Sequence, residues 1–276
     1  MDFVELKWQV QPDFSDILMA ELAEIGYDSF VDTEDGLNAY ITEDLFVEKA
    51  LQDLVQKYQG MAAFHYQFGT LAKKNWNEEW EKSYEPIIVD DVCLVRASFH
   101  PEDNRYPYQI IITPKMSFGT GHHETTAMML SSQLRTNHQG KAVLDVGCGT
   151  AILAIMAAKL GASQVTAFDI DEWPVENALE NIALNHCNNI AVSQGTIADV
   201  NPAEKYDIIL ANINRNVLLQ EIPVYASLLQ PGGQLLVSGF YEQDIKDINQ
   251  LAVQSGLTQA DQQSRNQWAC VIFQSG

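Results

Sequence analysis

The stretch Val143-Leu144-Asp145-Val146-Gly147-Cys148-Gly149-Thr150-Ala151 decides the fold of the larger part of this chain. It begins as an apolar strand, breaks into a turn at Gly147 and Gly149, and continues into a helix. Glycine lets a backbone approach a ligand closely, and the first turn of a helix presents free N–H groups. The stretch therefore predicts a ligand site where a strand passes into a helix.

Two acidic residues narrow the class of ligand. Asp145 precedes the glycines, where its charge repels phosphate, and the third glycine of a pyrophosphate-binding G-x-G-x-x-G turn is missing. Asp169 ends the next strand, 22 residues beyond Gly147, and can accept hydrogen bonds from both ribose hydroxyls. The pattern favours a neutral or cationic nucleoside over a nicotinamide dinucleotide. It predicts S-adenosylmethionine, bound by Asp145, Gly147, Gly149 and Asp169.

A helix N-cap is the alternative interpretation of Asp169, although Asp171 is better placed for that role. A later strand, 206–211, ends at Asn212. Because the ends of parallel strands line the ligand crevice, we expect Asn212 beside the reacting centre. A neutral amide can accept the N–H of an amine and aim its lone pair at a methyl group, in a displacement governed by positioning. Asn212 is the predicted catalytic residue, and a simple turn residue is the alternative.

The loop 117–126 is rich in glycine and threonine and precedes the α/β part of the chain. We interpret it as a lid from which Phe118 and Thr126 contact the cofactor. His122 and His123 are adjacent, but neighbouring histidines on a loop point apart, and no Cys or carboxylate spacing completes a tetrahedral site. No metal is expected. His123 as a proton acceptor is kept as an alternative role.

The order of predicted elements indicates two domains. From residue 142 onward strands alternate with helices, which is typical of a doubly wound parallel sheet. The segments 257–262 and 268–273 have no helix between them, so the last strand is expected to run antiparallel. Residues 1–68 follow the order β-α-β-β-α-β of a ferredoxin-like domain. A linker at 69–86 that contains a short helix then leads to the α/β domain at 87–276.

Charge is the most distinctive feature of the composition, with a net charge of −21. Residues 1–60 hold 14 Asp or Glu against three Lys or Arg, a net of −11. An acidic surface repels nucleic-acid backbones and attracts basic partners, so direct nucleic-acid binding is not expected. Solubility alone is the other explanation of the acidity.

Nothing in the sequence points to a membrane or to an oxidising compartment. No apolar run has the length of a membrane helix, and the first residues lack the basic start of a signal peptide. The four cysteines form no C-x-x-C pair, which suits free thiols in a reducing environment. A soluble, cytoplasmic, monomeric protein is expected.

Together these segments resemble the bacterial ribosomal protein L11 methyltransferase family over nearly the whole chain. The resemblance is carried by the acidic ferredoxin-like module, the pair Trp76 and Trp80 in the linker, the loop Phe118-Gly119-Thr120-Gly121, the glycine turn, and Ala211-Asn212-Ile213. It implies a Rossmann-like class I methyltransferase domain that binds S-adenosylmethionine through Thr126, Gly147, Asp169 and Asn212. It further implies that the N-terminal module holds a basic ribosomal protein, methylated on lysine side chains and on its N-terminal α-amine.

Three positions depart from the family pattern. His122 and Glu124 replace the usual Thr and Pro of the loop, and Asn214-Arg215-Asn216 follows where apolar or small residues are usual. Ala151 replaces a glycine of the turn, and its small side chain is expected to narrow the room for the cofactor. The first two departures bear on the substrate region and leave the choice of target amine open. The alternatives are a methyltransferase for another basic protein or a small amine, and a binding module without catalysis. The complete set of predicted cofactor residues argues against the latter.

Overall fold

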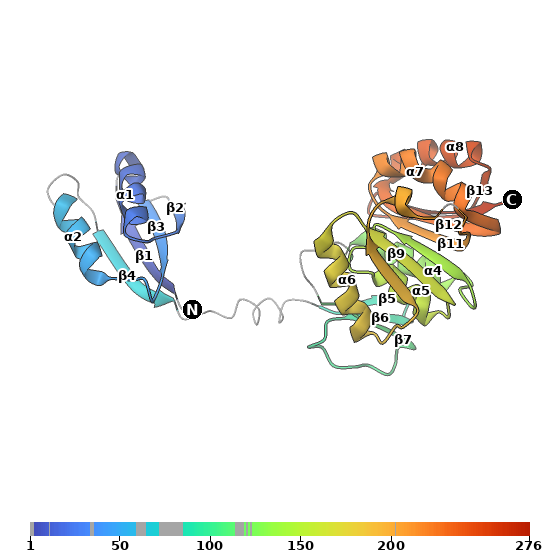
Figure 1. Cartoon of the computed structure of the whole chain (residues 1–276), viewed down its shortest axis with the longest axis horizontal. Helices are drawn as coiled ribbons and strands as arrows, with labels where there is room; N and C mark the ends of the chain where they lie inside the picture. Colours follow the sequence, from blue (N-terminus) through green and yellow to red (C-terminus); the bar gives the residue numbers. More distant parts are fainter. Residues whose placement is uncertain are drawn as a thin grey trace. The chain divides into compact units, whose positions relative to one another are not determined.

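The computed structural model describes the chain except for residues 1–2, 11, 34–35, 59–64, 72–84, 114–118, 120, 122 and 202. The chain divides into two compact units, Met1–Tyr84 and Glu85–Gly276 (Figure 1). The division falls within the segment predicted as the linker, 69–86. The predicted short helix of that linker and its tryptophan pair, Trp76 and Trp80, lie outside the described residues.

The first unit is a four-stranded antiparallel sheet with two helices. Its strand order is β2-β3-β1-β4, which is the predicted ferredoxin-like arrangement. The last strand lies three residues later than the predicted 62–68. The elements are β1 (Phe3–Gln9), α1 (Pro12–Glu24), β2 (Ser29–Thr33), β3 (Gly36–Thr42), α2 (Glu48–Tyr58) and β4 (His65–Leu71).

Alternation along β1 separates the core of this unit from its surface. Val4, Leu6 and Trp8 are buried, whereas Lys7 and Gln9 are exposed, because successive strand residues point to opposite faces. Buried side chains from the two helices cover the apolar face, and they are Leu18, Leu22, Leu51 and Leu54. The unit therefore has a hydrophobic core of its own.

The second unit is built on a seven-stranded sheet in the order β10-β9-β8-β11-β12-β14-β13. All neighbours from β10 to β12 are parallel, and β14 is antiparallel to both strands beside it. The predicted doubly wound sheet with an antiparallel last strand is confirmed. The strands are β8 (Ala142–Val146), β9 (Gln164–Asp169), β10 (Ile190–Gln194), β11 (Tyr206–Asn212), β12 (Leu229–Tyr241), β13 (Leu257–Arg265) and β14 (Trp268–Ser275).

Helices cover both faces of this sheet (Figure 1). Val143 of β8 belongs to the core beneath α4, α5 and α6, and its neighbour Leu144 to the core beneath α7 and α8. Strands that are buried on both faces have nearly continuous apolar sequences, and β8 and β11 are examples. The helices are α4 (Glu124–Leu134), α5 (Ile152–Lys159), α6 (Glu172–Leu184), α7 (Arg215–Leu228) and α8 (Ile245–Gln254), with short 3-10 turns at Ile197–Asp199 and Glu242–Asp244.

A small three-stranded sheet precedes the large one in the chain. Its strands β5 (Ile87–Val89), β6 (Cys93–Arg96) and β7 (Tyr108–Ile111) lie in the order β5-β6-β7. Buried residues of this sheet share a core with α4 and α5. The small sheet is therefore part of the second unit.

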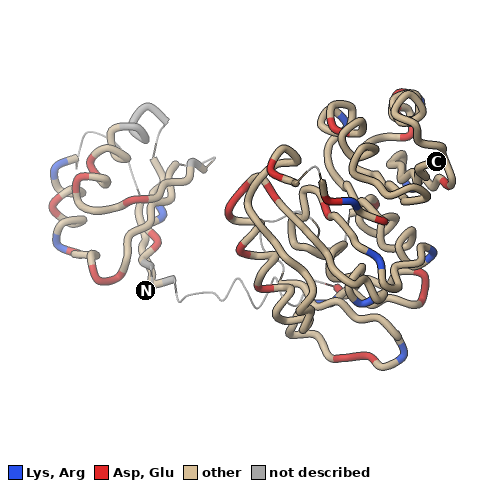
Figure 2. The backbone as a smooth tube through the Cα atoms, turned by 45° about the vertical axis from the view of Figure 1, so that its right-hand side comes forward, with Lys and Arg blue, Asp and Glu red and all other residues tan. Residues whose placement is uncertain are grey.

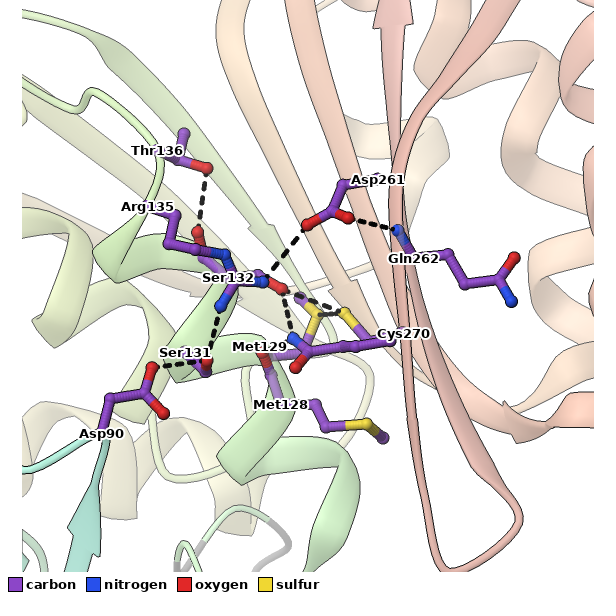
Figure 3. A network of polar contacts seen from close by, with 11 residues as sticks. Asp90, Met128, Met129, Ser131, Ser132, Arg135, Thr136, Asp261, Gln262 and Cys270 are labelled. Atoms are coloured by element: carbon purple, nitrogen blue, oxygen red, sulfur yellow. Dashed lines mark hydrogen bonds and ion pairs between the residues drawn. The ribbon is translucent and has the colours of Figure 1, made fainter.

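Polar contacts fasten the C-terminal end of α4 on two sides (Figure 3). The Ser131 hydroxyl donates to Asp90 Oδ2 in the β5–β6 turn at 2.6 Å and accepts from Arg135 at 2.7 Å. Arg135 also reaches Asp261 of β13 at 3.3 Å, and Ser132 lies 3.4 Å from Cys270 Sγ in β14. Nearly every position of α4 is buried, so the helix is a central element of the unit.

Acidic positions outnumber basic ones along both units (Figure 2). Among the described residues, no helix is long and apolar enough to span a membrane. Within the same part of the chain, no group of three or more His, Cys, Asp or Glu side chains is placed to hold a metal ion.

Candidate active site

A cavity of about 500 Å³ lies at the carboxyl ends of β8, β9, β11 and β12. This is the edge at which doubly wound sheets bind ligands, and the volume lies within the range of small-molecule sites. It is lined by His123, Thr125, Gly147, Gly149, Asp169, Ile170, Asp171, Pro174, Asn212, Ile213, Asn214, Gly239 and Trp268. Four predicted site residues, Gly147, Gly149, Asp169 and Asn212, thus line one cavity.

The glycine turn needs glycine for both conformation and space. Gly147 and Gly149 have positive φ angles of 63° and 54°. A Cβ atom on Gly147 would lie 2.6 Å from Cγ2 of Ile213, so a side chain there would displace the loop after β11. The backbone of β8 can therefore pass directly along the cavity wall.

Ala151, the departure in this turn, has a different consequence from the one expected. We predicted that its methyl group would narrow the room for the cofactor. The residue is fully buried and is not among the residues that line the cavity. It caps α5 with φ at +60°, a left-handed conformation that costs an L residue about 1–2 kcal/mol. The replacement of glycine by alanine at this position therefore adds backbone strain to the start of α5.

Asp169 supports the glycine turn from the end of β9. Its Oδ2 accepts the Gly149 N–H at 2.9 Å, and Oδ1 accepts the Asp171 N–H at 3.4 Å. The side chain is 9% exposed and lines the cavity. Each carboxylate oxygen accepts more than one hydrogen bond, so both can also receive a ligand hydroxyl. Asp171 is the N-cap residue of α6, but its side chain makes no capping hydrogen bond.

Asp145 lies behind the turn and is not among the cavity-lining residues. Its side chain is 1% exposed, and Oδ2 accepts the Ala154 N–H of α5 at 3.0 Å. Oδ1 is buried without a partner in the described part of the chain. Burial, together with the nearby charge of Asp169, raises the pKa of the Asp145 carboxyl to about 8. A cation placed close to this carboxyl would favour its charged form.

Asn212 meets α4 at the end of β11. Its Nδ2 donates to Thr126 Oγ1 at 3.4 Å, although 86 positions separate the two residues in the chain. Thr126 is fully buried and Asn212 is 9% exposed. Asn212 Oδ1 has no hydrogen-bond partner among the described residues, and the side chain lines the cavity. The carboxamide is therefore oriented through its nitrogen, while its oxygen can accept an N–H from a ligand.

His123 is the N-cap residue of α4. Its Nδ1 accepts the Thr125 N–H at 3.3 Å and lies 2.8 Å from Thr125 Oγ1. The imidazole ring meets Trp268 edge to face at 4.7 Å, and Trp268 in turn packs against Tyr241 at 4.2 Å. The capping contact occupies Nδ1, which does not favour that atom as a proton acceptor.

Two departures from the family pattern make structural contacts. Glu124 accepts from Asn266 Nδ2 at 2.6 Å, and Asn214 caps α7 by accepting the Val217 N–H at 3.1 Å. Arg215 pairs with Asp244 at 3.0 Å and with Asp247 at 2.5 Å, which joins α7 to the segment at α8. Asn214 alone of these residues lines the cavity. Phe118 and His122 lie outside the described residues.

The sequence did not identify Trp268, Gly239 and Thr125 as residues of the cavity. Trp268 reaches it because β14 is inserted between β12 and β13, a placement that no local pattern reveals. Gly239 has φ at +94°, and a Cβ there would lie 2.1 Å from the Ile213 carbonyl oxygen. A lone glycine within an apolar strand does indicate such a close backbone approach.

Comparison with known proteins supports one family. The family model described as ribosomal protein L11 methyltransferase matches residues 15–276. A ribosomal protein L11 methyltransferase from Phocaeicola vulgatus is 43% identical over 99% of both chains, and one from Porphyromonas gingivalis is 46% identical over 94% of this chain and 90% of its own. The crystal structure of ribosomal protein L11 methylase from Lactobacillus delbrueckii subsp. bulgaricus superposes with a TM-score of 0.65 at 29% identity, over 70% of this chain and 100% of its own.

Proposed function

The chain belongs to the ribosomal protein L11 methyltransferase family, and from this premise we propose that it transfers methyl groups from S-adenosylmethionine to amino groups of ribosomal protein L11. The observation that carries the reaction type is the Asn212 carboxamide. Asn212 lines the cavity, and its side-chain oxygen is buried and has no hydrogen-bond partner in the described chain. A buried acceptor of this kind favours a ligand that brings an N–H.

The cavity suits the cofactor because S-adenosylmethionine carries a positive charge and no phosphate. Asp169 would accept the ribose hydroxyls, and Gly147 and Gly149 would let the backbone lie against the ligand. Asp145 lies behind the turn and outside the cavity lining, so it would act on the cationic amino-acid portion through its charge or through water. Thr126 would contribute through Asn212, and Phe118 is retained as a predicted contact. The carboxylate of Asp169 in the cavity wall disfavours a pyrophosphate in the same place.

Methyl transfer needs positioning more than acid–base catalysis. When bound, S-adenosylmethionine supplies an electrophilic methyl group on its sulfonium. Asn212 accepts one N–H of a neutral amine and so directs the nitrogen lone pair toward the methyl carbon. In that orientation the amine nitrogen would take the methyl group, the demethylated cofactor would leave with the electron pair of its former carbon–sulfur bond, and the proton lost from nitrogen would pass to water. Holding the reactants in the right orientation can lower the activation free energy by about 7–11 kcal/mol relative to their collision in solution.

The substrate is a basic protein, and the acidic first unit is the proposed docking module. Its first 60 residues carry a net charge of −11, which speeds encounter with a basic partner. The targets are lysine side chains and the N-terminal α-amine of ribosomal protein L11. The enzyme acts as a cytoplasmic monomer on the protein and makes no direct contact with nucleic acid or membrane.

Labelled S-adenosylmethionine and an unmodified ribosomal protein extract provide the test. Label should enter ribosomal protein L11, and mass spectrometry should place it on lysine and on the N-terminal amine. Label mainly in another basic protein or in a small amine would contradict the substrate. Failure of the enzyme to bind S-adenosylmethionine in isothermal titration would contradict the reaction.

A further inference from the structure

Three asparagines, four residues apart, form a buried row that the reaction does not use: two lie on α6 and the third, Asn185, is its C-cap residue. Asn177, Asn181 and Asn185 are 1%, 0% and 6% exposed. They face the end of β7 and the residues just after it, and their amides bond to the backbone of Ile111 and Thr113. Four-residue spacing puts them on one side of the helix, where side chains can satisfy an extended backbone as a neighbouring strand would.

Asn185 and Asn181 make different connections. Asn185 accepts the Ile111 N–H at 2.9 Å and donates to the Ile111 carbonyl at 2.6 Å and to its own helix at 2.8 Å. Asn181 accepts the Thr113 N–H at 2.8 Å, but its Nδ2 donates to the Thr150 carbonyl at 3.0 Å. Asn185 therefore holds the end of β7 to α6. Asn181 instead joins Thr113, which follows β7, to Thr150 of the glycine turn.

The glycine turn carries the connection one step further. The Thr150 hydroxyl donates to the Gly119 carbonyl at 2.6 Å. Gly119 has φ at +99°, and a Cβ there would lie 2.8 Å from Thr150 Oγ1, so glycine is needed for this approach. Through Thr150, residues 113 and 119 are both tied to the Asn181 amide. His123 and Thr125, a few residues further on, line the cavity.

We infer that Asn181 is a positioning residue that couples Thr113 and Gly119 to the glycine turn, and so sets cofactor affinity without touching the cofactor. This inference rests on the proposed function. The amide is suited to the role because it both accepts an N–H and donates to a carbonyl, which neither an apolar side chain nor a carboxylate can do. Full burial removes water as a substitute partner.

The test compares Asn181→Ala with Asn185→Ala, a control at the C-terminal end of the same helix. Both lose buried amide hydrogen bonds, so both should lower the melting temperature. Only Asn181→Ala should raise the dissociation constant and the KM for S-adenosylmethionine, by about tenfold. Asn185→Ala should bind the cofactor within about twofold of the parent, and the kcat at saturating cofactor should change less than the KM in both variants.

Thr150→Val tests the second step of the connection and serves if Asn181→Ala fails to fold. It keeps the shape and the backbone carbonyl but loses the hydroxyl that reaches Gly119. Cofactor affinity should fall by about fivefold, and the double variant should lose less than the sum of the two free-energy changes. Equal cofactor affinities in Asn181→Ala and Asn185→Ala, or an unchanged affinity in Thr150→Val, would overturn the inference. A parent protein that does not bind S-adenosylmethionine would instead refute the proposed function.

Discussion

The two ends of α4 have the same degree of burial but different neighbours. At its start, His123 and Thr125 line the cavity and Thr126 orients Asn212. At its end, Ser131 and Arg135 join the helix to the β5–β6 turn and to β13. Both ends carry buried hydroxyl groups, so burial and residue type alone do not tell a functional residue from a stabilising one. The hydrogen-bond partner of each hydroxyl makes that distinction.

Asn212→Ala should produce the largest change at the cavity end. Removing the amide that aims the amine should lower kcat by about 100-fold, as loss of one catalytic hydrogen-bonding group commonly does. Radiolabel transfer to ribosomal protein L11 measures the rate, and thermal unfolding should show little change. A kcat within twofold of the parent would remove Asn212 from the mechanism.

Asp169→Ala should weaken cofactor binding by about 1–3 kcal/mol, the cost of losing a buried hydrogen-bond partner. Isothermal titration gives the affinity. Asp169→Asn is the matched control, because it can still accept the Gly149 N–H and so keeps the turn supported. An affinity unchanged in both variants would show that the ribose hydroxyls bind elsewhere.

Asp145 should show that a buried carboxyl behind the glycine turn also governs the stability of the fold. Its pKa is raised to about 8 from the usual 3.8, so between these values the folded protein holds a proton that the unfolded chain has lost. Its stabilising contribution is complete below about pH 4 and is lost as the pH rises toward 8, with a slope of up to about 1.4 kcal/mol per pH unit.

Asp145→Asn tests this because the amide oxygen can still accept the Ala154 N–H without a charge. Urea unfolding from pH 5 to pH 8 should show that the parent loses stability relative to the variant as the pH rises. A difference in unfolding free energy that stays constant over this range would mean that the carboxyl titrates normally.

Ser131→Ala should give the smallest effect and restrict it to stability. It removes the hydroxyl shared by Asp90 and Arg135 and should cost about 1 kcal/mol, because both partners remain close to solvent. The kcat/KM for S-adenosylmethionine should stay within about twofold of the parent. A large loss of activity at full folding would show that the far end of α4 also positions the cavity.

Much of the fold followed from local patterns. The apolar runs of β8 and β11, the alternation of β1, and the order of elements predicted both architectures, and the antiparallel last strand is confirmed. The predicted Gly147, Gly149, Asp169 and Asn212 do lie at one cavity, since the carboxyl ends of parallel strands share an edge. Their individual roles stay predictions.

Other parts of the site had no local signal. Trp268 depends on the insertion of β14 beside β12, and the Asn181 connection depends on α6 packing against the segment after β7. A tryptophan or an asparagine at such a position can have several structural roles. The role becomes clear only from the residue, distant in sequence, that it contacts in the fold. The four-residue spacing of Asn177, Asn181 and Asn185 can be seen in the sequence. It predicts that they share one face of a helix, but not which residues pack against that face.

By itself, the sequence determined where this chain must form strands, where its backbone must turn through glycine, and which side chains end the parallel strands. These features depend on conformational preference and hydrophobic period, which act over a few residues. Tertiary structure alone decided which hydroxyl of α4 meets Asn212, which amide of α6 reaches the glycine turn, and where Trp268 lies. Those contacts join residues dozens of positions apart, and they are set by the packing of whole elements.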